Sequence, residues 1–244
     1  MARTIRYRQI ADDVRRRLRT DEFGPGDVLA SENELAAEHG ASRVTVRRAL
    51  ELLRDDGLVD SRQGFGWFVA AAPVAQSLSV MSTIEAQLEA SGAVADRQVL
   101  TFSFIEAPAD VAEQLGVEQV LEVRRCNLAD GHPFARVTVW CPTELAADMS
   151  RNEVESSTFV ELIGGEFGGA RQTIGAIAAD EDDAEILRVP VGSPLLRARR
   201  LTYRPDGSPI LYSEHVFAAH RTEFEVDLPY DAELVSPAGL RLVQ

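Results

Sequence analysis

The arginines best placed for chemistry lie in one short stretch, residues 42–54. On a helix with 100° per residue, Arg43, Arg47 and Arg54 fall within about 40° of one another, beside an apolar stripe. A guanidinium can donate two hydrogen bonds to O6 and N7 of guanine, and its charge suits phosphate. The stretch could therefore read base edges of duplex DNA. A solvated helix face, on which the arginines offset nearby acidic residues, remains an alternative on spacing alone.

The elements that would position these arginines are three predicted helices. The first spans 7–19, with apolar residues every four positions. Ser31 and Glu34 have capping-box spacing and open a second helix, which ends at Gly40. Ser42 caps a third helix that runs to Gly57. Two helices joined by so short a turn predict a helix-turn-helix, in which the start of the second helix enters the major groove.

A glycine-rich hairpin is predicted directly after the third helix. Residues 58–62 and 67–69 form its strands, and the segment 63–66 joins them. This order is that of a winged helix, in which the wing tip reaches a minor groove or phosphates. For single residues the simpler interpretations stay open: Ser42 as a cap only, Arg48 and Arg54 as solvated, and Tyr7 and Trp67 as packing residues.

Charge divides the chain in the same way. Residues 1–72 hold 12 arginines and 12 acidic residues, whereas the other 172 hold 13 arginines and 27 acidic residues; there is no lysine. The overall net charge of −14 argues against non-specific binding to polyanions such as RNA or bulk DNA. The two parts are therefore expected to have different partners.

Beyond a small, uncharged segment at 71–78, which is interpreted as a linker, the pattern becomes α+β. Apolar-rich segments separated by turn residues predict a mostly antiparallel sheet, with Asp130-Gly131 and Asp206-Gly207 as hairpin turns. The strands are expected at 99–105, 120–128, 134–141, 171–178, 195–203 and 210–217, and helices at about 79–90, 108–115, 158–164 and 182–187.

This larger part carries no recognisable catalytic or metal-binding signature. There is no HExxH, P-loop or GxSxG, and the four histidines are scattered. Cys126 and Cys141 are expected to be reduced and buried, and the acidic run 180–183 to be a solvated helix start. We therefore expect no metal, no cofactor and no enzymatic activity. The absence of an apolar span or signal core predicts a cytoplasmic protein without membrane association.

Residues 7–69 resemble the DNA-binding domain of the GntR family of bacterial transcription regulators. The resemblance rests on GPGDVLASENELAAEHGASRVTVRRALELL, DDGLV and QGFGWFV. The chain departs from the family pattern at Ala30, where proline is usual, and at Phe65 and Trp67, where arginine and threonine are usual. The resemblance implies that the DNA contacts are Asn33, Ser42, Arg43, Thr45, Arg47 and the wing glycine Gly66.

Residues 79–228 resemble the UTRA effector-sensing domain of the HutC branch of that family, whose fold is similar to chorismate lyase. The motifs are VRRCNLADGHPF, TFVELIGGEFG and DDAEILRVPVGSPLLRARRLTYRPDGSPILYSEHVF. Matching implies effector contacts at Arg125, Asn127 and Thr158, with Thr158 able to hold an anion at a helix start. Other pocket positions that are polar in related members are Val137, Leu211, Phe217 and Ala218 in this chain. This loss of polar groups predicts a more apolar effector with one anionic end. Arg125 in a salt bridge with a neighbouring glutamate is the alternative.

The expected architecture is thus α+β in two domains: a winged helix-turn-helix at 1–70, a linker at 71–78 and a UTRA-like domain at 79–240. The expected function is a transcriptional regulator, a repressor, that binds palindromic double-stranded operator DNA as a homodimer and responds to a small-molecule effector. One alternative is an enzyme of chorismate-lyase-like fold with an accessory DNA-binding head. Another is a sequence-indifferent nucleoid or RNA-binding protein.

Overall fold

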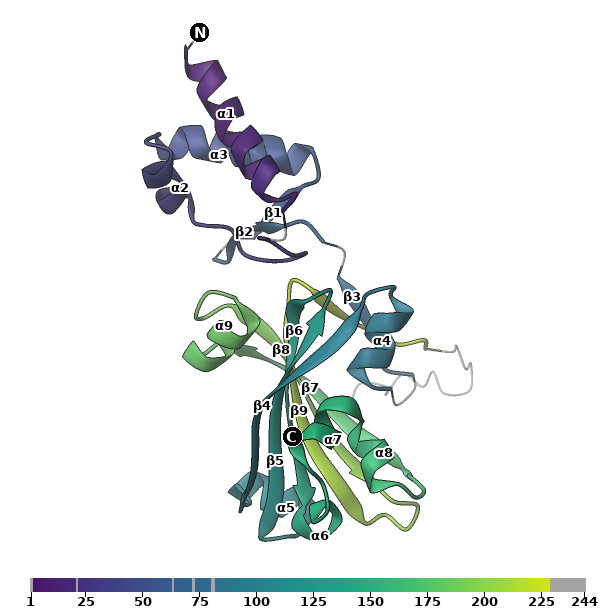
Figure 1. Ribbon diagram of the computed structural model, residues 1–244. Helices are drawn as coiled ribbons and strands as arrows, with labels where there is room; N and C mark the ends of the chain where they lie inside the picture. Colours follow the sequence, from purple (N-terminus) through teal and green to yellow (C-terminus); the bar gives the residue numbers. More distant parts are fainter. Residues whose placement is uncertain (1, 21, 63, 72, 80–81, 229–244) are drawn as a thin grey trace, which may run out of the picture.

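The computed structural model describes residues 2–20, 22–62, 64–71, 73–79 and 82–228, which form two domains stacked end to end (Figure 1). A smaller, mainly helical N-terminal domain lies above a larger domain built on a sheet. The residues 229–240 of the predicted effector domain lie outside the described residues. Within the described residues, no helix is long and apolar enough to cross a membrane.

The N-terminal domain is the predicted winged helix-turn-helix. It contains α1 (Ala2–Arg17), α2 (Glu32–Glu38), α3 (Arg43–Asp55), β1 (Val59–Arg62) and β2 (Gly66–Val69). Ser31 and Glu34 form the capping box of α2, and the Ser42 side chain accepts a hydrogen bond from the Thr45 amide at the start of α3. Both caps satisfy amides that a helix leaves free, so the short polar residues fix where each helix begins.

A core of its own holds this domain together. The buried stripe of α3 packs with apolar residues of α1, α2 and the wing, and its largest members are fully buried. The stripe of α3 consists of Val46, Ala49, Leu50 and Leu53. Because the opposite side of α3 is left to solvent, the arginines predicted beside the stripe face outward.

The segment assigned to a linker contains a strand that the sequence analysis missed. β3 (Val74–Ser77) pairs in parallel with β10 (Thr222–Glu225), and Val74 N donates to Arg221 O over 2.8 Å. Its small, mostly uncharged residues give no local signal for a strand, since the partner lies near the other end of the sequence. The junction between the domains is therefore tied to the end of the C-terminal domain.

The C-terminal domain is a six-stranded antiparallel sheet of order β4-β5-β6-β9-β8-β7. Its strands are β4 (Ala95–Glu106), β5 (Gln119–Ala129), β6 (His132–Pro142), β7 (Gly169–Ala178), β8 (Pro194–Tyr203) and β9 (Pro209–Ala218). The Asp130-Gly131 turn joins β5 and β6 with φ values of 51° and 77°, the conformation that a two-residue hairpin requires. Its helices are α4 (Ile84–Ala90), α5 (Ala109–Leu115), α6 (Thr143–Ala146), α7 (Arg151–Ser156), α8 (Phe159–Ile163) and α9 (Glu181–Leu187).

Helices cover both faces of this sheet. Leu88 of α4, Val154 of α7 and Phe159 of α8 join the main core on one face. On the other face α9 and α5 pack at separate places, through Leu187 and Leu115 respectively. Alternate residues of each strand therefore belong to different environments, which matters for the polar residues of β6, β8 and β9.

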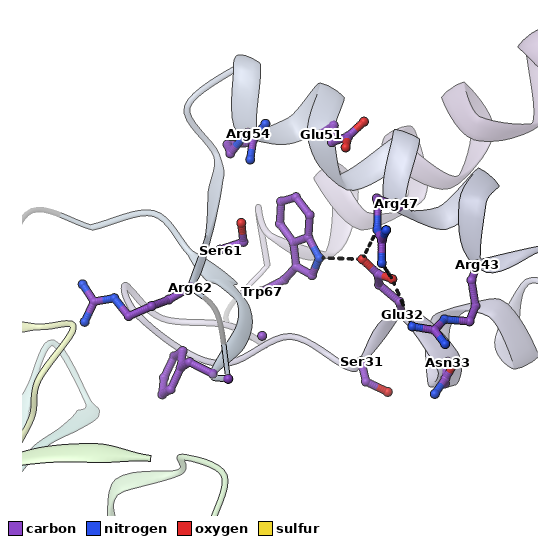
Figure 2. Close-up of a pocket in the computed structure, with 13 residues that line it drawn as sticks. Ser31, Glu32, Asn33, Arg43, Arg47, Glu51, Arg54, Ser61, Arg62 and Trp67 are labelled. Atoms are coloured by element: carbon purple, nitrogen blue, oxygen red, sulfur yellow. Dashed lines mark hydrogen bonds and ion pairs between the residues drawn. The ribbon is translucent and has the colours of Figure 1, made fainter. Parts of the chain in front are cut away.

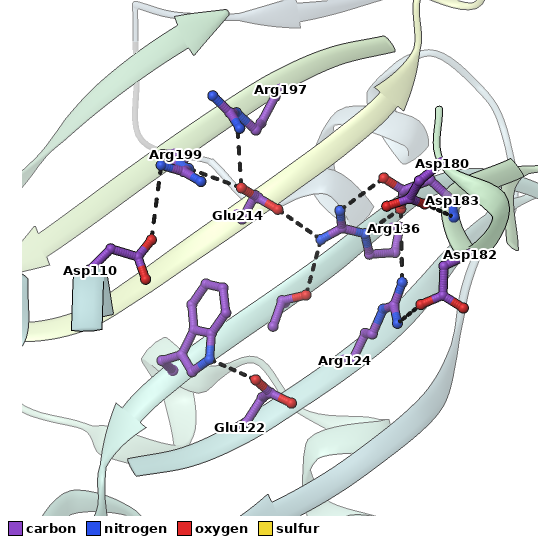
Figure 3. A network of polar contacts seen from close by, with 12 residues as sticks. Asp110, Glu122, Arg124, Arg136, Asp180, Asp182, Asp183, Arg197, Arg199 and Glu214 are labelled. Carbon is purple, nitrogen blue, oxygen red and sulfur yellow. Dashed lines mark hydrogen bonds and ion pairs between the residues drawn. The ribbon is translucent and has the colours of Figure 1, made fainter. Parts of the chain in front are cut away.

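A network of buried charges anchors α9 to the sheet (Figure 3). The guanidinium of Arg136 makes two hydrogen bonds to the Asp183 carboxylate, of 2.8 and 3.1 Å, and a third of 3.0 Å to Glu214. The acidic run 180–183 opens α9 as predicted, with Asp180 as its cap, but Asp183 is buried, so the expectation of a solvated run is wrong there. Arg136 explains the difference, since its charge compensates the buried carboxylate.

Candidate nucleic-acid interface and ligand pocket

The first candidate site is an open groove of about 640 Å³ between α2, α3 and the wing (Figure 2). The predicted contacts Asn33, Arg43, Arg47 and Gly66 all line it, together with Arg54 and Arg62. The side chains of Arg43 and Arg47 are 62% and 56% exposed. Ser42 and Thr45 lie at the first turn of α3, where their hydroxyls are 2.8 Å apart, but they are not among the lining residues.

Glu32 organises the arginines of this groove. Its carboxylate accepts hydrogen bonds of 2.8 and 2.7 Å from Arg47 and one of 3.3 Å from the indole of Trp67, and it lies 3.7 Å from Arg43. The hydrogen bonds from Arg47 lower the pKa of Glu32, so the carboxylate stays ionised. A two-point ion pair fixes the plane of a guanidinium, and Arg47 is thus oriented before any ligand arrives.

Sequence reasoning missed Glu32, because its partner Arg47 is 15 positions later on another helix and only the fold brings them together. The interpretation of Tyr7 and Trp67 as packing residues is confirmed, since both are buried. Arg48 and Arg54 are not simply solvated: their guanidinium groups lie 4.7 Å from the ring of Tyr7 and 5.8 Å from that of Trp67.

The second candidate site is a pocket of about 380 Å³ between the main-core face of the sheet and the segments around α4 and α8. Of the predicted effector residues, Arg125 and Thr158 line it and Asn127 does not. Its apolar wall includes Ile84, Val139, Phe159, Val160 and Leu211. Its polar wall includes Ser82, Thr83, Arg200, Thr202, Ser213 and His215.

Arg125 has spare capacity to bind an anion. Its side chain is 9% exposed, and burial lowers its pKa to about 10, which leaves it charged at neutral pH. The alternative of a glutamate partner is confirmed in that Arg125 Nη2 lies 3.6 Å from Glu85. However, Glu85 also pairs with Arg97 at 3.1 Å, and Nε and Nη1 of Arg125 are buried without a hydrogen-bond partner. Unpaired buried donors are costly, so a ligand that accepts from them is favoured.

Two predicted roles in this pocket need correction. Asn127 is fully buried and donates a hydrogen bond of 2.7 Å to Glu85, so it orients the partner of Arg125 rather than facing the pocket. The Thr158 hydroxyl donates to the Glu161 carboxylate over 2.9 Å and accepts from the Glu161 amide, which closes a capping box. The start of α8 is therefore occupied by the chain's own carboxylate. Thr158 and Glu161 have the same spacing as Ser31 and Glu34, and this spacing indicates a capping box.

The pocket also holds polar residues that no sequence motif indicated. Arg200 of β8 donates to Gln172 over 2.8 Å and to the Ser82 carbonyl over 3.2 Å, while burial lowers its pKa. Burial, with nearby arginines, lowers the pKa of His215 to about 3, so its ring is neutral. The pocket is thus more polar than the matching of family positions implied: Val137 and Phe217 are apolar and buried, but β8 and β9 supply Arg200, Ser213 and His215.

Family models match both domains. The model described as "Bacterial regulatory proteins, gntR family" matches residues 6–69, and that of the UTRA domain matches residues 90–223. The chain is 34% identical to the HTH-type transcriptional regulator Rv0792c of Mycobacterium tuberculosis, over 91% of this chain and 85% of that protein. It is 27% identical to the HTH-type transcriptional repressor NagR of Bacillus subtilis, over 89% of this chain and 92% of that protein.

Solved structures agree. The crystal structure of PhnF from Mycobacterium smegmatis matches with a TM-score of 0.60 and 26% identity, over 91% of this chain and 100% of that one. A further relative, the mannosyl-D-glycerate transport/metabolism system repressor MngR of Escherichia coli, is 30% identical over 86% of this chain and 90% of its own length. These relatives are transcription regulators and not enzymes. The alternative of an enzyme with an accessory DNA-binding head is therefore set aside.

Proposed function

The chain belongs to the GntR family of bacterial regulators and carries a UTRA domain, and from this membership we propose that it is a repressor released from its operator by a small anionic effector. It is a DNA-binding transcriptional regulator, like its relatives. We propose repression rather than activation because both NagR and MngR are named as repressors. The proposed site of action is the cytoplasm, where bacterial operators lie.

The observation that carries the DNA-binding part is the pair Arg43 and Arg47 on the first two turns of α3, exposed and held by Glu32. Helix starts of this kind enter the major groove, where Arg47 exchanges part of its ion pair with Glu32 for base or phosphate contacts. One such surface makes few base contacts, so we propose a homodimer that reads two half-sites of a palindrome. Asn33, Ser42, Thr45 and Gly66 are proposed as additional contacts.

For the effector, we propose a molecule with one carboxylate or phosphate and an otherwise largely apolar body. The unpaired donors of Arg125, with Arg200 on the same pocket, favour the anionic end. The apolar wall formed by Phe159, Leu211 and their neighbours favours the remainder. Hydroxyls of a sugar that face this apolar wall would stay unpaired, at about 1–3 kcal/mol each, since the polar groups lie on the other wall of the pocket.

A thermal-shift panel of small metabolites tests the effector class. Apolar carboxylic acids are expected to raise the melting temperature of the wild-type protein, and the hits to lower its affinity for an operator duplex. Replacement of Arg125 by Met should abolish both effects, whereas replacement of the exposed Arg171 by Met should preserve them. A clear preference for amino-sugar phosphates over apolar acids would refute the proposed class.

A further inference from the structure

Two phenylalanines of the wing are buried against the effector domain. Phe65 is 4% exposed and Phe68 is 6% exposed. Both belong to one apolar cluster with Ala184 and Leu187 of α9 and with strand residues of β8 and β9. The ring of His220 lies 4.4 Å from that of Phe65 and 5.1 Å from that of Phe68. The two phenylalanines are thus withdrawn from solvent, whereas Gly64 and Gly66 beside them remain exposed.

The turn before α2 contributes a second part of the same contact. His220 Nε2 donates a hydrogen bond of 2.7 Å to the carbonyl of Gly26, and His132 Nδ1 lies 3.2 Å from the Asp27 carboxylate. The side chain of Arg221 packs on Gly26, where φ is +81° and a Cβ would collide with it. Gly24 meets the His132 ring in the same way. Glycines at both positions therefore permit a close approach of the two domains.

The effector-domain side of this contact is tied to the sheet by hydrogen bonds. α9 is held to the sheet by Arg136 and Asp183, and Arg221 Nη1 donates to the Pro133 carbonyl over 2.6 Å. Burial lowers the pKa of His220 to about 4, so the ring is neutral near pH 7 and packs against both phenylalanines. We call the surface that receives the wing and the turn before α2 the wing seat: His132, Ala184, Leu187, Ala218, His220 and Arg221.

We propose that the wing seat is an interaction surface whose partner is the wing of the same chain, and that the docked form binds operator DNA weakly. Phe65 stands where the resemblance noted above leads one to expect arginine, the side chain suited to phosphates, so the tip is better fitted to an apolar seat than to DNA. Operator binding requires that the wing leave the seat.

Strand β9 links this contact to the ligand pocket. Ser213 and His215 line the pocket, while Ala218 and His220, a few residues further on, belong to the wing seat. A ligand that orders β9 therefore favours the docked form and lowers operator affinity, the direction required for release of repression by an effector. This inference rests on the proposed function.

A cross-link tests the proposal directly. In the double variant F65C/H220C, a short bis-methanethiosulfonate reagent should join the two introduced thiols within one chain. The native Cys126 and Cys141 are buried, and burial raises their pKa values to about 11 and 12, so they should not compete. The cross-linked protein is expected to bind a selected operator duplex at least tenfold more weakly, and reduction should restore the affinity. Failure to cross-link in the absence of DNA, or unchanged affinity after cross-linking, would overturn the proposal.

A second set of variants approaches the contact from the side that cannot touch DNA. H220A should raise operator affinity by about 3- to 10-fold, and F65A/H220A should gain no more than that, because both changes open the same contact. F104A, at a half-exposed phenylalanine of β4, is the matched control and should change nothing. Unchanged affinity in H220A would count against the wing seat. If no form of the protein, reduced or cross-linked, binds any duplex selectively, it is the proposed function that fails.

Discussion

Arginine side chains are exposed in one domain and buried in the other, and they serve different purposes there. In the N-terminal domain, Arg43 and Arg47 are more than half exposed, and both pair with Glu32. In the C-terminal domain, Arg125 and Arg136 are about one-tenth exposed and deeply embedded in the sheet. An exposed arginine costs little free energy and is available to bind a polyanion, whereas a buried arginine destabilises the fold at every donor that lacks a partner. The comparison predicts opposite consequences when each is removed.

The largest effect is expected on stability, at the buried pair. Replacement of Asp183 by Ala leaves buried Arg136 with the carboxylate of Glu214 and the hydroxyl of Thr138, and should lower the free energy of unfolding by about 3–5 kcal/mol. Urea denaturation of the full chain measures this. Replacement of the more exposed Asp182, which pairs with Arg124, is the matched control and should cost less than about 1 kcal/mol. Similar losses in both variants would show that burial does not distinguish the pairs.

Loss of an exposed arginine should weaken DNA binding and leave stability almost unchanged. Replacement of Arg43 or Arg47 by Ala is expected to weaken specific operator binding by about 1–3 kcal/mol while leaving the unfolding free energy nearly unchanged. Fluorescence anisotropy with a labelled duplex, together with urea denaturation, separates the two effects. Arg19, exposed in the turn after α1, provides a charge-matched control. Unchanged affinity in both variants would contradict the groove assignment.

Acidification should destabilise the protein through His215, the histidine of the ligand pocket. The pKa of His215 lies at about 3 in the folded protein, below its ordinary value, so the unfolded chain takes up the proton first as the pH falls. Its contribution is complete above about pH 6.5 and is lost as the pH falls from there toward 3. Between pH 7 and pH 5 the wild-type protein should therefore lose roughly 2 kcal/mol more stability than H215Q. Parallel pH profiles would contradict the burial argument.

The smallest effect concerns the support of Arg47. Replacement of Trp67 by Phe keeps an aromatic ring in the core but removes the indole donor to Glu32. Specific operator affinity should fall by about 1 kcal/mol or less, since Arg47 retains its two bonds to Glu32. An effect as large as that of losing Arg47 itself would mean that Trp67 contacts DNA directly.

Local signals predicted much of this molecule. The caps at Ser31 and Ser42, the buried stripe of α3 and the Asp130-Gly131 hairpin turn each depend on residues only a few positions apart, and each is present. Six strands of the larger sheet were predicted for the same reason, with bounds a few residues too short.

The errors share a different cause. The pairing of β3 with β10, the burial of Asp183 by Arg136 and the closure of the ligand pocket by Arg200 and His215 all depend on residues far apart in the sequence. A charged residue looks solvated until the fold supplies its partner, and this is why the acidic run 180–183 and the polarity of the pocket were misjudged. The docking of Phe65 could not be predicted either, because its seat is formed by the other domain.

The most direct test of the central claim, that the exposed arginines of α3 read a DNA sequence, is a ratio of affinities. Duplexes selected from a random pool by the purified full chain, and scrambled versions of them, are titrated with wild-type protein and with Arg47→Ala near physiological salt. The account predicts that wild-type protein prefers the selected duplex by at least about 10³-fold and that the variant loses a large part of this preference. Equal affinity for selected and scrambled duplexes, in wild type as in the variant, would contradict it.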